Sequence, residues 1–280
     1  MDYRHPIRFG TFPTPLAADP QRSVRLAQLS ERLGFDLVTF QDHPYQPAFL
    51  DTWTLMSYAA ATTTSIRIAP NVLNLPLRPA PVTARAAASL DLLSDGRFAL
   101  GIGSGGFWDA IEAMGGRRLT AGQAVEALTE AIPLIRDLWD TDSHAVVRGG
   151  AYYPVDGAKR GPAPAHRVPI WVGAYKPRML RLTGRLADGW LPSLGYMRPG
   201  DIAQANARID DAAADADRRP DEIVRLLNIS GRETPEQLTA LAVEDGISTF
   251  IVAGDDPGFL QRFIVETASA VREAVAAERG

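Results

Sequence analysis

The hydrophobic positions along the chain change their period many times, between the alternation of a strand and the spacing of a helix. Residues 7–12 alternate like a half-buried strand. The apolar stripe of the helix that follows comprises Leu26, Leu29 and Leu33. Residues 35–40 are apolar at almost every position, which is typical of a strand covered on both faces in a parallel sheet.

The same strand-then-helix unit recurs to the end of the chain. Each of the later predicted strands precedes a helical pattern, and these strands lie near residues 66–69, 97–102, 169–173, 188–191, 223–229 and 248–252. Together they make eight units in one chain. This number fits a (β/α)8 TIM barrel, an α/β fold, better than an open sheet with a second domain.

The repeat is interrupted at residues 140–168. Two short stretches, 144–148 and 151–155, flank Gly149-Gly150, which predicts a two-residue hairpin. Because the repeat resumes at residue 169, we interpret this segment as an insertion after the fourth unit. The prediction is one barrel domain over residues 1–280.

The composition removes several kinds of chemistry. The chain has no cysteine, which excludes disulfides, thiol nucleophiles and iron–sulfur clusters. With 29 Lys and Arg against 33 Asp and Glu, the chain has a net charge of -4 and no excess of basic residues that would bind nucleic acid. The four histidines have no metal-ligand spacing, so no metal site is expected. The apolar runs are far shorter than the ~20 residues that span a bilayer. We therefore expect a cytoplasmic, soluble protein without nucleic-acid or membrane partners.

In a TIM barrel the reacting groups lie at the carboxyl ends of the strands. Asp42 and His43 come directly after the second predicted strand. A carboxylate beside an imidazole suits an acid–base pair at this position. The alternative is that Asp42 caps the loop and His43 is a turn residue.

Two amides, Asn71 and Asn74, follow the third predicted strand. They either hydrogen-bond the edge of a planar heterocycle or satisfy the backbone of their own loop. Residues 101–106 match G-x-G-x-x-G, but they follow the fourth strand and no helix begins directly after them. These glycines either let the chain pass close under a flat ligand or form a tight turn.

Residues 173–178 join the fifth predicted strand to its helix. Free backbone N–H groups at a helix start, with Lys176 and Arg178 beside them, suit a phosphate. The alternative is a solvated basic loop. From the residues alone, we expect a barrel that holds a planar, phosphorylated small molecule near His43.

Residues 67–78, 90–105 and 171–190 resemble the bacterial luciferase-like monooxygenase superfamily. Within it they resemble the branch that uses the deazaflavin coenzyme F420. The resemblance runs from about Ile7 to Leu191. It implies an eight-stranded barrel with an insertion, and family members are often homodimers.

The resemblance also implies roles for individual residues. Asp42 would contact the deazaflavin, His43 would act in acid–base catalysis, and Asn71-Val72 would form a non-prolyl cis peptide that supports the ring. The other implied cofactor-binding positions are Asn74, Ser104, Gly105, Gly173, Ala174, Tyr175, Lys176, Arg178 and Met179.

Two positions depart from the family pattern. Gly106 stands where the sugar-phosphate dehydrogenases of the family have a catalytic Glu, which argues against that substrate. Lys176 stands where the phosphate turn usually has Gly.

The expected reaction is hydride transfer between C5 of the deazaflavin and a small organic substrate, with His43 as the proton donor or acceptor. One alternative is an FMN-dependent monooxygenase that uses reduced flavin and oxygen. The other is a flavin-binding protein without turnover. The Asp42-His43 pair favours an enzyme, since a storage protein needs no proton donor.

Overall fold

One parallel sheet of nine strands rolls up so that its two ends are halves of the same interrupted strand. The computed structural model describes residues 2–280, and the sheet order is β3-β2-β1-β11-β10-β9-β8-β5-β4. The strands are β1 (Arg8–Phe12), β2 (Leu37–Phe40), β3 (Arg67–Pro70), β4 (Leu73–Asn74), β5 (Leu100–Gly103), β8 (Ile170–Val172), β9 (Gly189–Trp190), β10 (Val224–Ile229) and β11 (Thr249–Ala253).

Strands β3 and β4 together form the third strand of the barrel. An isolated bridge between Ile68 and Phe98 and the two-residue ladder of β4 with β5 close the ring. The longest ladder pairs β1 with β11 over five residues. The predicted (β/α)8 barrel is therefore confirmed, with eight strands when β3 and β4 are counted as one.

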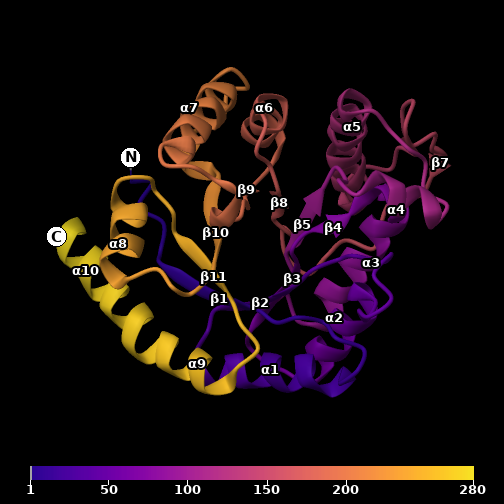
Figure 1. Cartoon of the computed structure of the whole chain (residues 1–280). Helices are drawn as coiled ribbons and strands as arrows, with labels where there is room; N and C mark the ends of the chain where they lie inside the picture. The colour runs from indigo at the N-terminus through magenta and orange to yellow at the C-terminus, as the bar shows by residue number, and fades with distance from the viewer. Residues whose placement is uncertain (1) are drawn as a thin grey trace.

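Helices surround the barrel on its outside (Figure 1). The α-helices are α1 (Pro20–Leu33), α2 (Thr52–Ala61), α3 (Ala80–Leu93), α4 (Trp108–Ala113), α5 (Ala121–Trp139), α6 (Pro177–Leu186), α7 (Asp201–Ala214), α8 (Pro235–Val243), α9 (Pro257–Arg262) and α10 (Ser269–Arg279). Short 3-10 turns are η1 (Leu75–Leu77), η2 (Leu194–Tyr196) and η3 (Pro220–Glu222), and η4 (Phe263–Ala268) is a π-helical segment between α9 and α10. Within residues 2–280 no helix is long and apolar enough to cross a membrane.

Local sequence signals explain where several helices begin. Thr120 forms the predicted capping box with Gln123 at the start of α5, and Thr234 repeats it at α8. The side chain of Asp51 accepts a hydrogen bond from the backbone N–H of Thr54 at the start of α2. These caps fix the helix starts that face the carboxyl ends of the strands.

The barrel interior is apolar and tightly packed. All four residues of β2 and of β5 are buried, as continuous apolar runs in a parallel sheet predict. A Cβ atom at Gly101 would lie 2.1 Å from the carbonyl oxygen of Pro70. Only glycine therefore lets β5 pass this close to the end of β3.

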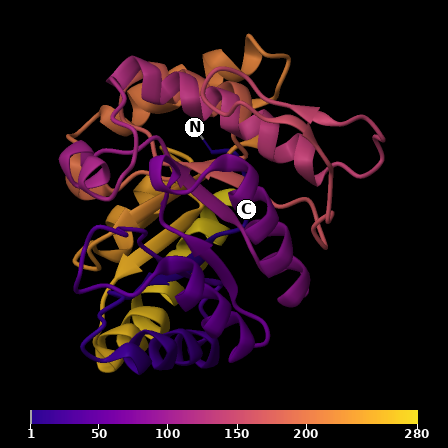
Figure 2. The same cartoon turned by 90° about the vertical axis from the view of Figure 1, so that its right-hand side faces the viewer.

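The insertion leaves the barrel between α5 and β8 and projects to one side (Figure 2, pink). It contains an antiparallel pair, β6 (Val147–Arg148) and β7 (Asp156–Ala158). Because the connection between these strands spans residues 149–155, the predicted two-residue hairpin at Gly149-Gly150 is wrong.

The physical reason lies on helix α5. The carboxylate of Glu130 accepts hydrogen bonds from the backbone N–H groups of Gly150, Tyr152 and Tyr153, at 3.0, 3.0 and 2.6 Å. Residues 150–153 are therefore held against the helix and do not pair with the preceding strand.

Candidate active site

A cavity of about 540 Å³ opens at the carboxyl ends of the strands. Its walls come from the carboxyl ends of β1, β4, β5 and β10 and from residues after β2, β3, β5, β8 and β9. It brings together nearly all of the residues predicted from the sequence: Asp42, His43, Asn71, Val72, Asn74, Ser104, Gly105, Gly173, Ala174, Tyr175, Lys176 and Met179. Arg178 does not line it.

The break between β3 and β4 lies at the base of this cavity. The peptide bond between Asn71 and Val72 is cis, as the resemblance predicts. The side chain of Val72 lies beside three glycines: an added Cβ would lie 2.8 Å from it at Gly103 and 3.4 Å from it at Gly101 and at Gly173. The three glycines therefore leave room for Val72 under the cavity.

Asp42 is held by an arginine that the sequence analysis missed. The Asp42 carboxylate is 1% exposed and accepts hydrogen bonds from the Arg78 side chain at 3.0 and 3.3 Å. It also accepts one from the backbone N–H of Asn74 at 2.9 Å. Arg78 binds Asp51 as well. Burial alone would lower the pKa of Arg78, but the bonds to these two carboxylates outweigh it and raise that pKa.

His43 stands apart from this ion pair. No hydrogen bond joins its side chain to Asp42, or to any other side chain between residues 2 and 280. Aromatic rings surround the imidazole instead: Tyr45 and Phe49 stack on it at 5.3 and 6.4 Å, and Phe107 meets it edge-on at 5.5 Å. Asp42 and His43 are therefore not hydrogen-bonded to each other, and Asp42 acts on His43 through its charge.

The pKa of His43 follows from these surroundings. Burial lowers it below the ordinary 6.5, and the negative charge of Asp42 offsets part of this effect. We expect a proton NMR titration, assigned with His43→Gln, to give a midpoint below 6.5. A midpoint above 6.5 would contradict this environment. Since the folded pKa is depressed, the stability contributed by neutral His43 is present above pH 6.5 and is lost as the pH falls through 6.5 toward the folded pKa.

Asn71 does not offer its amide to a ligand. Its side chain exchanges two hydrogen bonds with the side chain of Asn228 on β10, at 2.6 and 3.1 Å. Asn71 also donates to Thr39, and Asn228 donates to Ser193. The Asn71 amide is therefore bonded to neither of the partners expected from the sequence, since it contacts side chains of other strands and not the backbone of its own loop.

Asn74 behaves differently. Its side chain is 6% exposed, lines the cavity and makes a hydrogen bond with the Tyr45 side chain. Its Oδ1 atom has no hydrogen-bond partner among residues 2–280. A buried acceptor without a partner is costly unless a ligand supplies a donor. This atom therefore points to a bound N–H or O–H group.

The start of helix α6 forms another edge of the cavity. Its first backbone N–H groups have no acceptor inside the helix. The Lys176 side chain lines the cavity beside them, and the Tyr175 hydroxyl accepts a hydrogen bond from the backbone N–H of Ser193 at 2.7 Å. Arg178 turns its guanidinium away to Glu126 on α5, at 3.4 Å. The turn can therefore take a phosphate with backbone amides and one lysine.

In the segment after β5, two structural reasons require glycine at position 105. Gly105 has a φ of +93°, and an added Cβ would lie 2.7 Å from Pro76. At Gly106 nothing lies within 4 Å of an added Cβ, so this position faces open space. Ser104 lines the cavity beside them.

Known proteins resemble this chain in sequence and in fold. The family model described as luciferase-like monooxygenase matches residues 1–279. A phthiodiolone/phenolphthiodiolone dimycocerosates ketoreductase from Mycobacterium kansasii is 37% identical over 195 residues, which are 67% of this chain and 49% of that protein. A 5,10-methylenetetrahydromethanopterin reductase from Archaeoglobus fulgidus is 31% identical over 253 residues, 89% of this chain and 72% of that protein.

Among solved structures, an F420-dependent secondary alcohol dehydrogenase in complex with an F420–acetone adduct superposes with a TM-score of 0.83 at 17% identity. The superposition covers 95% of this chain and 99% of that one, which shows a shared fold. The match to the ketoreductase spans about half of that relative's length.

Proposed function

The chain belongs to the luciferase-like monooxygenase family, and on that basis we propose that it is an F420-dependent oxidoreductase that interconverts a ketone and a secondary alcohol. The observation that carries the proposal is that one cavity holds both the His43 imidazole and Asn74 Oδ1, neither of which has a hydrogen-bond partner among residues 2–280. The ketoreductase activity named for the M. kansasii relative supports the substrate class.

The residues of the cavity fit a deazaflavin. Val72 offers an apolar surface for a flat ring, and Asn74 Oδ1 offers an acceptor for a ring N–H. Lys176 and the backbone amides at the start of α6 offer a phosphate site. When bound, F420 supplies the ring carbon that accepts or gives up a hydride.

His43 would move the proton that accompanies the hydride. Its lowered pKa keeps it neutral near pH 7, so it can take the hydroxyl proton of a secondary alcohol. In the reverse direction the protonated imidazole would give that proton to the carbonyl oxygen. Tyr45, Phe49 and Phe107 would limit the access of water to the imidazole.

A side-by-side fluorescence titration with F420 and FMN tests the cofactor. We expect F420 to bind at least tenfold more tightly than FMN. Asn74→Leu is expected to weaken F420 binding about fivefold, since it removes one hydrogen bond to the ring. The melting temperature of this variant serves as the control for folding.

Two other outcomes would overturn the proposal. Tight FMN binding with weak F420 binding would favour a flavin-dependent monooxygenase that uses reduced flavin and oxygen. F420 binding without reduction across a panel of secondary alcohols and ketones would favour a binding protein without turnover.

A further inference from the structure

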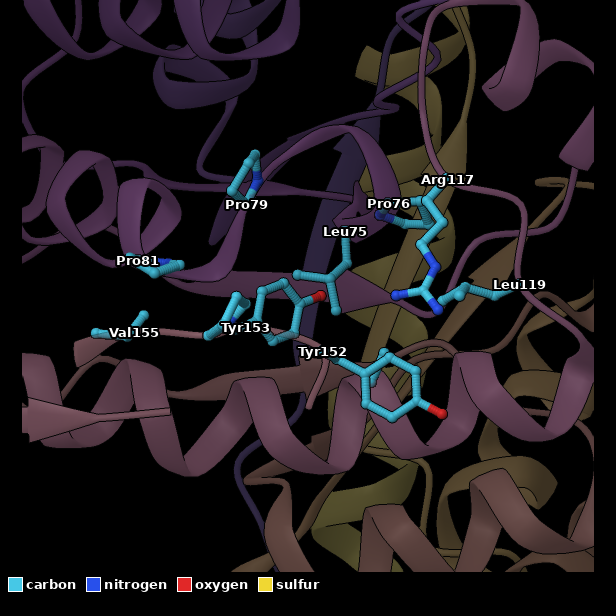
Figure 3. A pocket seen from close by; sticks show the side chains of 11 residues that line it. Leu75, Pro76, Pro79, Pro81, Arg117, Leu119, Tyr152, Tyr153 and Val155 are labelled. Carbon is cyan, nitrogen blue, oxygen red and sulfur yellow. The ribbon is translucent and has the colours of Figure 1, made fainter. Parts of the chain in front are cut away.

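A second cavity, of about 320 Å³, lies outside the candidate active site (Figure 3). It is enclosed by η1, the start of α3, the loop before α5, and the insertion. Its volume lies at the lower end of the range of small-molecule sites, about 300–1,000 Å³. The catalytic proposal does not use it.

The lining of this cavity is mostly apolar and contains one cation and two tyrosine side chains. Figure 3 shows Pro79, Pro81 and Val155 at one end, with the guanidinium of Arg117 at the other end beside Leu119. Within residues 2–280, the exposed side chain of Arg117 has no ion pair. A guanidinium without a carboxylate partner, at one end of an apolar cavity, can bind the anionic group of a ligand whose apolar body contacts the cavity wall.

Two carboxylates of α5, Glu126 and Glu130, have partners other than Arg117. Glu126 accepts a hydrogen bond from the Tyr152 hydroxyl at 2.7 Å and pairs with Arg178. Glu130 is bound to backbone N–H groups of the insertion. Arg117 is therefore the one charged side chain of the described residues that lines the cavity.

Tyr153 offers a second polar contact. It lines the cavity, and its hydroxyl makes no hydrogen bond within residues 2–280. Burial raises the pKa of this phenol, and the charge of Glu130 adds to the effect, so it stays protonated and can donate.

We propose that this cavity binds a small carboxylic acid with an apolar body, its carboxylate on Arg117 and its body against Leu75, Pro79 and Pro81. The site is separate from the one for F420, and it does not depend on the proposed reaction. Linear carboxylic acids of medium chain length and aromatic carboxylic acids both combine a carboxylate with an apolar body.

Isothermal titration of the cofactor-free protein with octanoate tests the proposal, with octanol and octylamine as chain-matched probes. We expect saturable binding of octanoate, binding of octanol at least tenfold weaker, and no binding of octylamine. Arg117→Gln is expected to weaken octanoate binding about tenfold and to leave octanol binding unchanged.

Arg118→Gln is the matched control, because Arg118 binds Asp109 and Glu112 and does not line the cavity. It should bind octanoate like the natural protein. Ala127→Leu fills the base of the cavity and should abolish binding of both probes; Leu119→Trp does so from a loop if Ala127→Leu does not fold.

Failure of octanoate to saturate at millimolar concentrations would overturn the proposal. So would equal losses in Arg117→Gln and Arg118→Gln. Since the titration contains no F420, a negative result here leaves the proposed oxidoreductase function untouched, and weak F420 binding leaves this site untouched.

Discussion

Replacement of His43 by alanine is expected to lower turnover with F420 by about 100- to 10,000-fold, the range that general acid–base catalysis contributes. The affinity for F420 is expected to change by no more than about twofold. The imidazole makes no hydrogen bond in the described part of the chain, so its removal leaves no buried partner unsatisfied. Initial rates of F420 reduction by a secondary alcohol, together with a fluorescence titration, measure the two quantities.

His144→Ala is the matched control, since His144 is an exposed histidine on the insertion and does not line the cavity. Its rate should equal that of the natural protein. His43→Gln should be as slow as His43→Ala, because an amide fills the space but cannot carry the proton. A rate for His43→Ala close to that of the natural protein would remove His43 from the reaction.

Replacement of Arg78 by leucine is expected to destabilise the fold by about 3 kcal/mol, because it leaves the carboxylate of Asp42 buried without its cation. The side chain of Asp42 is 1% exposed and that of Arg78 is 19% exposed, so solvent screens this pair weakly. Urea denaturation, followed by circular dichroism, measures the free energy of unfolding.

The double variant Asp42→Asn/Arg78→Leu is expected to recover part of the lost stability, since the amide carries no charge to bury. Arg25→Leu breaks an ion pair whose side chains are 60% and 51% exposed. It should cost less than about 1 kcal/mol. Equal losses in Arg25→Leu and Arg78→Leu would show that the Asp42 carboxylate does not depend on its cation.

Local patterns were enough to predict the barrel. Strand alternation, apolar helix stripes and caps such as the Thr120 capping box depend only on residues a few positions apart. The strand-then-helix unit that they define recurs eight times along the chain. The carboxyl ends of the strands then locate the cavity, which is why Asp42, His43 and Asn74 were predicted to lie together.

Contacts between distant residues could not be predicted in this way. Arg78 binds Asp42 across 36 positions, and Asn228 binds Asn71 across 157. Nothing in the sequence near Asn71 indicates that its amide forms hydrogen bonds with Asn228 on β10. The hairpin prediction failed for the same reason. The Glu130 carboxylate on α5 accepts a hydrogen bond from the backbone N–H of Gly150, and turn preferences consider only the residues of the turn itself.

The ladders that join the strands differ in length around the barrel. The third strand meets the next strand through one bridge and one two-residue ladder, and two-residue ladders also join β1 to β2, β8 to β9 and β9 to β10. Strands β1 and β11 share a ladder of five residues, and β10 and β11 share one of four. Local opening costs least where the fewest backbone hydrogen bonds must break. The β1–β11–β10 side of the ring is therefore the part that resists local opening most.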